Sequence, residues 1–213
     1  MADLADKRKS YDKGSLCADD LSSDPIIQFE RWYQDAEKAG IDEPNAMTLA
    51  TATANGQPSA RIVLLKGFGQ KGFAFYTNYT SRKGQELSAN PQGALLFFWK
   101  ELERQVRIEG EVVKTSEDES ISYFHSRPRG SQLSAWASPQ SQEIKEHYLK
   151  EKREEVVKRF DGVDPLPLPQ HWGGYIVKPS VIEFWQGREN RYHDRIKFRL
   201  SDNGSWSCTR LAP

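Results

Sequence analysis

The stretch SARIVLLKGFGQKGFAFYTNY, which runs from Ser59 to Tyr79, decides the fold. Two runs rich in β-branched and aromatic residues flank the turn-forming sequence GQKG, and this pattern predicts a pair of antiparallel strands. Similar strand-like runs occur on either side, at 46–53, 93–100 and 104–114. Short successive strands joined by tight turns favour an antiparallel barrel or sandwich over a parallel sheet with crossover helices.

Helices are predicted to interrupt these strands. The first begins at Asp24 and Pro25, because Asp is a good N-cap and Pro suits the first helical position, and it ends at Gly40. A later helix opens with a capping box formed by Ser116 and Glu119. The helices after the first are expected at 80–91, 115–127, 130–138 and 138–160.

The two ends of the chain differ in character. Residues 1–23 are polar and lack periodicity, so we expect a flexible arm followed by one domain at 24–213. After a Pro-rich connection, strand-like runs return at 172–179, 180–187, 193–200 and 205–211. The predicted fold class is therefore mainly β with inserted helices (α+β), completed by a C-terminal hairpin.

Composition limits the classes of protein to which the chain can belong. Its 213 residues, 37% of them hydrophobic, suffice for one large domain with a real core. The formal net charge is zero, whereas nucleic-acid-binding proteins usually carry an excess of cations. Neither a signal peptide nor an apolar run of about 18 residues is recognisable. Cys17 and Cys208 form no C-x-x-C pair, so we expect a reducing, cytoplasmic location.

Cations and aromatic residues gather near the C-terminus. The sequence EFWQGRENRYHDRIKF, at 183–198, surrounds a predicted turn and contains Trp185, Arg188, Arg191, His193 and Arg195. Charge runs are usually solvated, but cations that alternate with aromatic rings are typical of a site for a ligand that is both anionic and flat.

A phosphate site is predicted at SRKG. Arg82 and Lys83 fall in the first turn of a predicted helix, where cations oppose the helix dipole at a cost of roughly a few tenths of a kcal/mol. An anion bound at the helix N-terminus would reverse that penalty. The alternative is an exposed basic pair. Arg61 and Lys66 would point to opposite faces of one strand unless Gly67 marks a bulge, and each alone is more typical of an edge cation that reaches solvent than of a ligand site.

The run RQVRIEG alternates regularly between polar and apolar residues. Gln105, Arg107 and Glu109 share one face of the predicted strand, and Val106 and Ile108 share the other. A polar face in a barrel mouth would bind a heterocycle through hydrogen bonds. A solvated outer face explains the same alternation equally well.

Several other chemistries are not supported. The four histidines, at 125, 147, 171 and 193, lie far apart, and none has the spacing of a metal ligand. No G-x-S-x-G motif is present, which argues against an α/β-hydrolase. The sequence GFGQKG, at 67–72, lies between two strands, so it is a turn and not a dinucleotide-binding fingerprint.

Together these segments resemble the pyridoxine/pyridoxamine 5′-phosphate oxidase family. The resemblance runs nearly end to end, and its most specific segments are SARIVLLKGF, TNYTSRKGQEL, RQVRIEG, YFHSRPRGSQ and EFWQGRENRYHDR. It implies a split β-barrel homodimer with FMN at the subunit interface and a dimerisation hairpin at 172–213. The implied reaction oxidises pyridoxine or pyridoxamine 5′-phosphate to pyridoxal 5′-phosphate. O2 is the implied acceptor, and H2O2 is released together with NH3 from the amine.

The resemblance also implies the residues that bind FMN. Arg82 and Lys83 would hold the phosphate, in agreement with the helix-dipole argument, and Gln105 would contact the flavin ring. Gln140 and Ser141 would bind from the start of the long helix. The whole implied set is Arg61, Ile62, Val63, Leu64, Tyr76, Thr77, Arg82, Lys83, Gln105, Gln140, Ser141, Trp185 and Arg195.

A second implied set binds the substrate. Tyr123, Arg127 and Ser131 would hold its phosphate, and Arg191 and His193 are implied as catalytic residues that orient it for hydride transfer to the flavin. Its members are Arg8, Tyr11, Lys66, Tyr123, Arg127, Ser131, Arg191 and His193. Arg8 and Tyr11 would close over the substrate as part of a mobile lid. Gly130 and Tyr192 stand where relatives often carry other residues, and we expect little consequence.

Two alternatives remain open at this stage. A split barrel can also belong to a flavin-binding protein or a flavin reductase without activity on vitamin B6 compounds. The substrate-phosphate residues and the RYHDR sequence favour the oxidase, because a flavin carrier needs neither. A nucleic-acid-binding barrel is the other alternative, and the neutral net charge argues against it.

Overall fold

The computed structural model describes residues 4, 6 and 9–213. Their contacts divide the chain into two compact units. Unit 1 comprises Met1–Leu49, Ala94–Gly110 and Pro179–Pro213, and unit 2 comprises Ala50–Gly93 and Glu111–Lys178. The boundaries fall inside four strands, so β1, β5, β6 and β7 each contribute to both units.

Strands outnumber helices among the secondary-structure elements that the described residues form. The strands are β1 (Ala46–Ala52), β2 (Pro58–Leu64), β3 (Gly67–Gly69), β4 (Gly72–Asn78), β5 (Gln92–Trp99), β6 (Arg104–Lys114), β7 (Trp172–Gln186), β8 (Asp194–Leu200) and β9 (Trp206–Leu211). The α-helices are α1 (Pro25–Lys38), α2 (Arg82–Ala89), α3 (Glu117–Ser126), α4 (Arg129–Ala137) and α5 (Tyr148–Arg159), and short 3-10 turns are η1 (Ala18–Asp20), η2 (Lys100–Leu102) and η3 (Glu189–Arg191). Hydrogen bonds join the strands in the order β2-β1-β5-β6-β7-β4-β3, and β8 lies between β7 and β9. The predicted class, mainly β with inserted helices, is confirmed.

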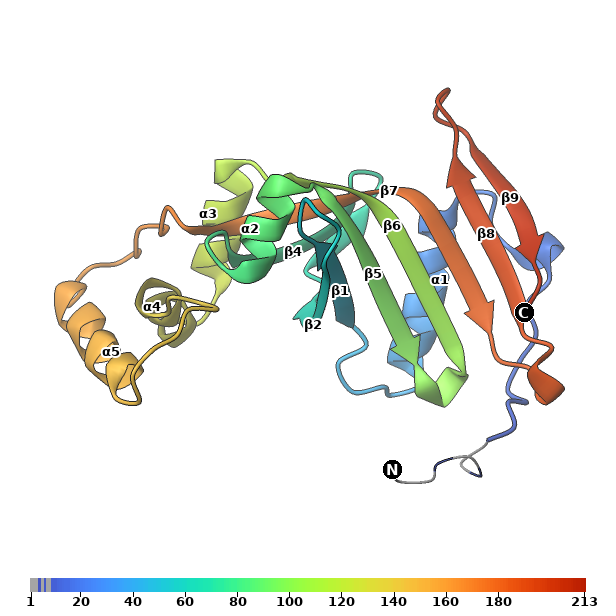
Figure 1. The fold of residues 1–213 in the computed structure, drawn as a ribbon, viewed down its shortest axis with the longest axis horizontal. Helices are drawn as coiled ribbons and strands as arrows, with labels where there is room; N and C mark the ends of the chain where they lie inside the picture. The colour runs from blue at the N-terminus through green and yellow to red at the C-terminus, as the bar shows by residue number, and fades with distance from the viewer. Residues whose placement is uncertain (1–3, 5, 7–8) are drawn as a thin grey trace. The chain divides into compact units, whose positions relative to one another are not determined.

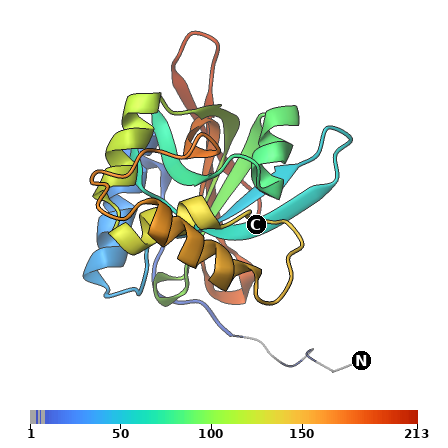
Figure 2. The ribbon, with the colours of Figure 1, turned by 90° about the vertical axis from the view of Figure 1, so that its left-hand side faces the viewer.

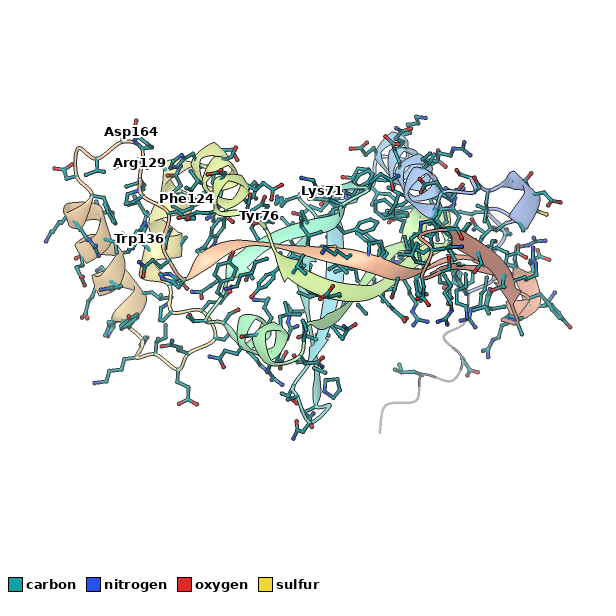
Figure 3. The ribbon with its side chains drawn as sticks, turned by 90° about the horizontal axis from the view of Figure 1, so that it is seen from above. Lys71, Tyr76, Phe124, Arg129, Trp136 and Asp164 are labelled. Carbon is teal, nitrogen blue, oxygen red and sulfur yellow. The ribbon has the colours of Figure 1, made fainter. Side chains whose placement is uncertain are left out.

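In unit 2, α3, α4 and α5 enclose a hydrophobic cluster next to β4 and the first half of β7. Phe124, Phe160, Leu166 and Trp172 are its largest buried members. Figure 2 shows α4 and α5, in yellow and orange, side by side. Arg129 on α4 binds the segment that follows α5, because its guanidinium donates hydrogen bonds of 2.9 Å to the carbonyls of both Phe160 and Val163. Arg129 and Trp136 are labelled in Figure 3.

In unit 1, the second half of β7 pairs with β8, and β8 pairs with β9, all antiparallel (Figure 1). Aromatic side chains of α1 fill the core of this unit. Phe29 lies 5.1 Å from Phe97 between ring centroids, and Trp32 lies 5.1 Å from Phe184. This packing gives β7 and β8 a rigid base for the residues that follow Gln186.

The local sequence signals are confirmed. The Asp24 side chain accepts a 2.8 Å hydrogen bond from the backbone N–H of Ile26, and Pro25 opens α1. Ser116 and Glu119 form the predicted capping box of α3. On β6, Val106 and Ile108 are fully buried, as the alternation predicted. These signals each depend on residues close in sequence, which explains why they are readable without the fold.

Two predicted boundaries are wrong. The long helix begins at Tyr148 and not at Ser138, because Ser141 has a φ of 71°, which an α-helix cannot contain. The runs 172–179 and 180–187 form one strand, β7, despite Pro179. Pro179 falls between the ladder with β4, which ends at Val177, and the ladder with β8, which starts at Val181, so neither ladder needs its missing N–H.

Two further properties concern possible metals and membranes. Within the part of the chain that the structure describes, no three His, Cys, Asp or Glu side chains are arranged to hold a metal ion. The helices formed by the described residues are all too short or too polar to span a bilayer.

Candidate active site

A cavity of about 600 Å³ lies within unit 2. It brings together residues from β2, β4, α2, α3 and the loop after α4. The residues that line it are Ser59, Ala60, Arg61, Ile62, Val63, Leu64, Lys66, Tyr76, Thr77, Arg82, Lys83, Tyr123, Arg127, Gln140, Ser141 and Trp172. Most of the side chains that the sequence assigned to FMN or to substrate phosphate therefore share one space.

Cations cluster at the start of α2, where Ser81 caps the helix by accepting from the backbone N–H of Gly84. Lys83 is only 7% exposed, and its Nζ lies 3.2 Å from both Thr77 Oγ1 and Gln140 Oε1. Burial, and then the nearby charge of Arg61, lowers the pKa of the Lys83 ammonium. Both partners are neutral, so the positive charge of Lys83 is not compensated, and the side chain is suited to bind an anion.

Sequence reasoning missed Glu86, which organises the other cations. Its carboxylate, 4% exposed, accepts from Arg82 Nε at 2.9 Å and lies 3.4 Å from Arg61 NH2. It also accepts hydrogen bonds from the hydroxyls of Thr51 and Ser59. Burial alone would raise the pKa of Glu86, but these hydrogen bonds lower it to about 2. A glutamate at i+4 from an arginine is common on helix surfaces, so the sequence carries no signal that this one is buried.

Aromatic rings and an arginine form another part of the cavity. The Tyr123 ring is nearly parallel to that of Tyr76, with centroids 3.9 Å apart, and to that of Trp172, at 6.1 Å. The Arg127 guanidinium lies 4.7 Å from the centre of the Trp172 ring. Burial lowers the pKa of Arg127, and its buried NH1 has no hydrogen-bond partner. A buried, unsatisfied guanidinium N–H is costly unless an anion reaches it.

Lys66 lines the same cavity as Arg61 although strand alternation predicts opposite faces. The reason is that β2 ends at Leu64 and β3 begins at Gly67, so Lys66 lies in the break between two strands. Gln140 and Ser141 also line the cavity, but from a loop and not from a helix. Ser131, on α4, is not among the described residues that line it.

The remaining predicted residues lie in unit 1, apart from Arg8, which is outside the described residues. Tyr11, Arg191 and His193 line a cavity of about 430 Å³ together with Lys9, Ser10, Arg188 and Asn190. The His193 ring lies 4.7 Å from Trp185 and 5.8 Å from Tyr11 between centroids. Gln105 is half-buried on β6 and lines neither cavity.

His193 is held in one tautomer. The backbone N–H of Arg188 donates a 3.1 Å hydrogen bond to His193 Nδ1, so this nitrogen carries no proton. Burial, and then the charge of Arg191, lowers the pKa of His193. The neutral ring therefore presents Nε2–H as a hydrogen-bond donor.

Arg195, on β8, forms an ion pair with a buried acid on β7, the strand that also carries Trp185. Its Nε and NH2 donate to the two oxygens of Glu183, 5% exposed, at 3.0 and 3.1 Å. Hydrogen bonding to Glu183 raises the pKa of Arg195. Trp185 is its register partner across β7 and β8, so the two side chains are fixed relative to each other.

We expect Glu86→Gln to remove an acid-sensitive part of the stability. The folded pKa of about 2 is below the ordinary value of 4.5, so ionised Glu86 stabilises the native state above pH 4.5, and this contribution is lost as the pH falls toward 2. At neutral pH the variant should be less stable by on the order of 3 kcal/mol. Denaturant unfolding from pH 7 to pH 2 measures this, with the exposed Glu146→Gln as control. A constant difference between variant and parent over this range would contradict the assigned role.

Comparison with known proteins places the chain in a family. Residues 33–159 match the family described as pyridoxamine 5′-phosphate oxidase, and residues 172–213 match the pyridoxine 5′-phosphate oxidase C-terminal dimerisation region. The pyridoxine/pyridoxamine 5′-phosphate oxidases of Salinibacter ruber and Cupriavidus necator are 55% and 56% identical to it, each over 100% of both chains.

Solved structures agree with this assignment. PhzG from Burkholderia lata, in complex with tetrahydrophenazine-1-carboxylic acid, has a TM-score of 0.87 and 33% identity over 96% of this chain and 100% of its own. A pyridoxamine 5′-phosphate oxidase-related, FMN-binding protein from Nostoc punctiforme has a TM-score of 0.73 at 16% identity, over 90% and 99%, which is a likeness of fold alone. The family resemblance read from the sequence is thus confirmed, and the chain belongs to the pyridoxine/pyridoxamine 5′-phosphate oxidases, a family of oxidoreductases with a split-barrel fold.

Proposed function

We propose that the protein binds FMN and oxidises pyridoxine and pyridoxamine 5′-phosphates to pyridoxal 5′-phosphate, with O2 as acceptor and release of H2O2, and of NH3 from the amine. The observation that carries this proposal is one cavity lined by five cations. Arg61 and Arg82 contact Glu86 next to Lys83 at the start of α2, and we assign these three to a first group that holds one phosphate. Arg127, whose buried NH1 has no hydrogen-bond partner, is assigned with Lys66 to a second group. Two phosphorylated ligands require two such groups, whereas a flavin carrier or reductase requires one.

The first group fits the phosphate of FMN. The N-terminus of α2 offers backbone N–H groups and a favourable dipole, and the buried Lys83 ammonium has no carboxylate among its hydrogen-bond partners. Glu86 holds Arg61 and Arg82 on one side, which fixes their direction before the anion arrives. Tyr76, Thr77, Gln140 and Ser141 would contact the rest of the cofactor.

The second group fits the phosphate of the substrate. Arg127 NH1 is buried without a hydrogen-bond partner, and Lys66 and Tyr123 line the same cavity. We propose that an anionic oxygen of the substrate completes the hydrogen bonding of Arg127, because charge-assisted pairs with arginine are strong and directional. Ser131 remains a proposed member of this set.

The protein is proposed to act as a homodimer in which unit 2 of one subunit and unit 1 of the other form each site. The match of residues 172–213 to a dimerisation region supports the homodimer. Trp185, Arg191, His193 and Arg195 would then complete the unit 2 cavity of the partner, as would Gln105. Unpaired Cys17 and Cys208 support a reducing, cytoplasmic location.

Bound FMN supplies the hydride acceptor, and the residues of this chain supply position and charge. Lys66, Tyr123 and Arg127 fix the phosphate end of the substrate. His193, with Nδ1 occupied by the Arg188 N–H, donates from Nε2 and orients a substrate oxygen or nitrogen. Arg191 adds a positive charge beside it. In this arrangement His193 cannot take a proton at Nε2, so its role is that of a donor.

The proposal is tested by the visible spectrum of the purified protein and by peroxide release. We expect FMN, not FAD, on denaturation, and peroxide with pyridoxine 5′-phosphate but far less with pyridoxine. Flavin binding without phosphate-dependent oxidation would favour the alternative of a flavin-binding protein or reductase. A colourless protein that takes up no added FMN would exclude both.

The affinity for FMN is expected to fall at alkaline pH. The pKa of Lys83 lies below its ordinary value of 10.5 in the free protein, and a bound phosphate favours the charged form. Affinity is therefore complete below the lowered pKa and decreases as the pH rises through it. Fluorescence titrations with FMN from pH 7 to pH 10 measure this, and riboflavin, which lacks the phosphate, should show no such decrease. Equal pH dependence for both would exclude Lys83 as a phosphate ligand.

Arg195→Ala is expected to weaken FMN binding. Loss of one charge-assisted contact costs about 1.5–3 kcal/mol, which is roughly ten- to a hundredfold in affinity. The substitution also removes the two hydrogen bonds that Arg195 donates to the buried Glu183 carboxylate. The double variant Glu183→Gln, Arg195→Ala, which carries no charge at position 183, is therefore the control. If the double variant binds FMN as tightly as the parent, the loss came from the stranded carboxylate and Arg195 does not contact the cofactor.

A further inference from the structure

Glu103 is a buried acid in unit 1 that the proposed function does not use. It follows η2 at the turn between β5 and β6, its side chain is 0% exposed, and its backbone is left-handed with a φ of 54°. A buried carboxylate in a strained backbone position is doubly unfavourable, so its contacts must compensate for both.

These contacts reach the N-terminal segment. Glu103 Oε2 accepts hydrogen bonds from two successive backbone N–H groups, those of Asp12 at 2.9 Å and Lys13 at 3.1 Å. Lys13 Nζ donates to the carbonyl of Glu101 at 2.6 Å. Glu103 Oε1 lies 3.6 Å from Lys9 Nζ and makes no hydrogen bond. One side chain therefore fixes two consecutive peptide groups, Tyr11–Asp12 and Asp12–Lys13.

The other side of the segment contacts one residue proposed to bind FMN, Trp185, and one proposed to bind substrate, His193. The Tyr11 ring stands edge-on to Trp185, at 5.8 Å and 88°, and to His193, at 5.8 Å and 65°. The Glu103 carbonyl accepts from the N–H of Gly187, the residue after β7. A Cβ atom at Gly187 would lie 2.8 Å from both Cβ and Cγ of Tyr11, so only glycine leaves room for this ring.

We propose that Glu103 is a positioning residue: its carboxylate anchors residues 12–13 and thereby holds Tyr11 against Trp185 and His193, as one wall of the cavity that contains Arg191. Only the expected change in the KM for substrate rests on the proposed function. The anchor itself is a property of the folded chain. The occupant of the cavity is the phosphorylated pyridine substrate.

The test uses the FMN-loaded protein and the variant Glu103→Gln. Loss of the charge-assisted acceptor should raise the rate of tryptic cleavage after Lys13 by about tenfold and raise the KM for pyridoxine 5′-phosphate by a similar factor, with FMN affinity unchanged. Glu101→Gln is the matched control, because Glu101 contacts Lys13 only through its main-chain carbonyl. Gly187→Ala keeps the Glu103 carboxylate but places a Cβ atom 2.8 Å from Tyr11 and 3.1 Å from the Cβ of Glu103. It should reproduce the Glu103→Gln result and carries the test if that variant does not fold.

The readouts separate the two proposals. Faster cleavage in Glu103→Gln supports the anchor even if the parent does not oxidise pyridoxine 5′-phosphate, an outcome that would overturn the proposed function alone. Cleavage and KM equal to those of Glu101→Gln would overturn the anchor. A loss of FMN affinity equal to the loss of substrate affinity would show a general structural defect and would also overturn it.

Discussion

Mixing chains that carry Arg127→Ala with chains that carry His193→Ala is expected to restore up to about a quarter of the parent activity, assuming random pairing into dimers. Each homodimer keeps one lesion in every site. Arg127 lies in unit 2 and His193 in unit 1, so in the proposed shared site one site of a mixed dimer would collect both lesions and the other none. The measurement is peroxide release after joint unfolding and refolding, with the residual activity of each homodimer measured separately and subtracted.

These two positions suit the experiment because neither neutralises a buried acid. Arg61 contacts Glu86, and Arg195 contacts Glu183, so their removal would take one cation away from a buried carboxylate. Heterodimers are verified by distinct affinity tags on the two chains. Activity that stays at the level of the separate variants, despite proven heterodimers, would rule out a site shared between subunits.

His193→Ala should lower turnover by about two- to tenfold, the effect of losing one hydrogen bond from a neutral donor, and leave FMN affinity unchanged. Because the ring presents Nε2–H as a donor, His193→Gln should recover part of this loss through its side-chain amide. The comparison is kcat for the parent, His193→Ala and His193→Gln at saturating substrate, with FMN affinity from fluorescence titration.

The glutamine variant distinguishes the two possible roles of the ring. An amide can donate a hydrogen bond but cannot act as a base near neutral pH. If His193→Gln is as slow as His193→Ala although both bind FMN and substrate normally, proton acceptance and not donation is the function of His193.

The parts of this fold that could be predicted from sequence depend on neighbouring residues. The Asp24 cap, the Ser116–Glu119 capping box and the alternation of β6 are set by side chains within a few positions of one another. The helix expected from Ser138 was misplaced because distant partners dominate there. Gln140 contacts Thr77 and Lys83, and these contacts accompany a non-helical Ser141.

The candidate site shows the same division. Arg82 and Lys83 were readable because a cation in the first turn of a helix is locally unfavourable. Glu86 and Glu103 were not readable, because a glutamate near cations or in a turn is ordinarily solvated. Their burial follows from strands that are far away in sequence, and only the folded chain shows that two acids direct the cations and the N-terminal segment of the site.

The five cations that line the unit 2 cavity belong to a chain whose formal net charge is zero. An approaching phosphorylated molecule is therefore not attracted by the protein as a whole, and the pull begins only within about a Debye length, roughly 10 Å at 0.1 M salt. Inside that distance, the walls of the cavity concentrate the field on the ligand. Under the proposed function, the protein would bind a small dianion without the long-range attraction to nucleic acids and anionic surfaces that a net positive charge produces.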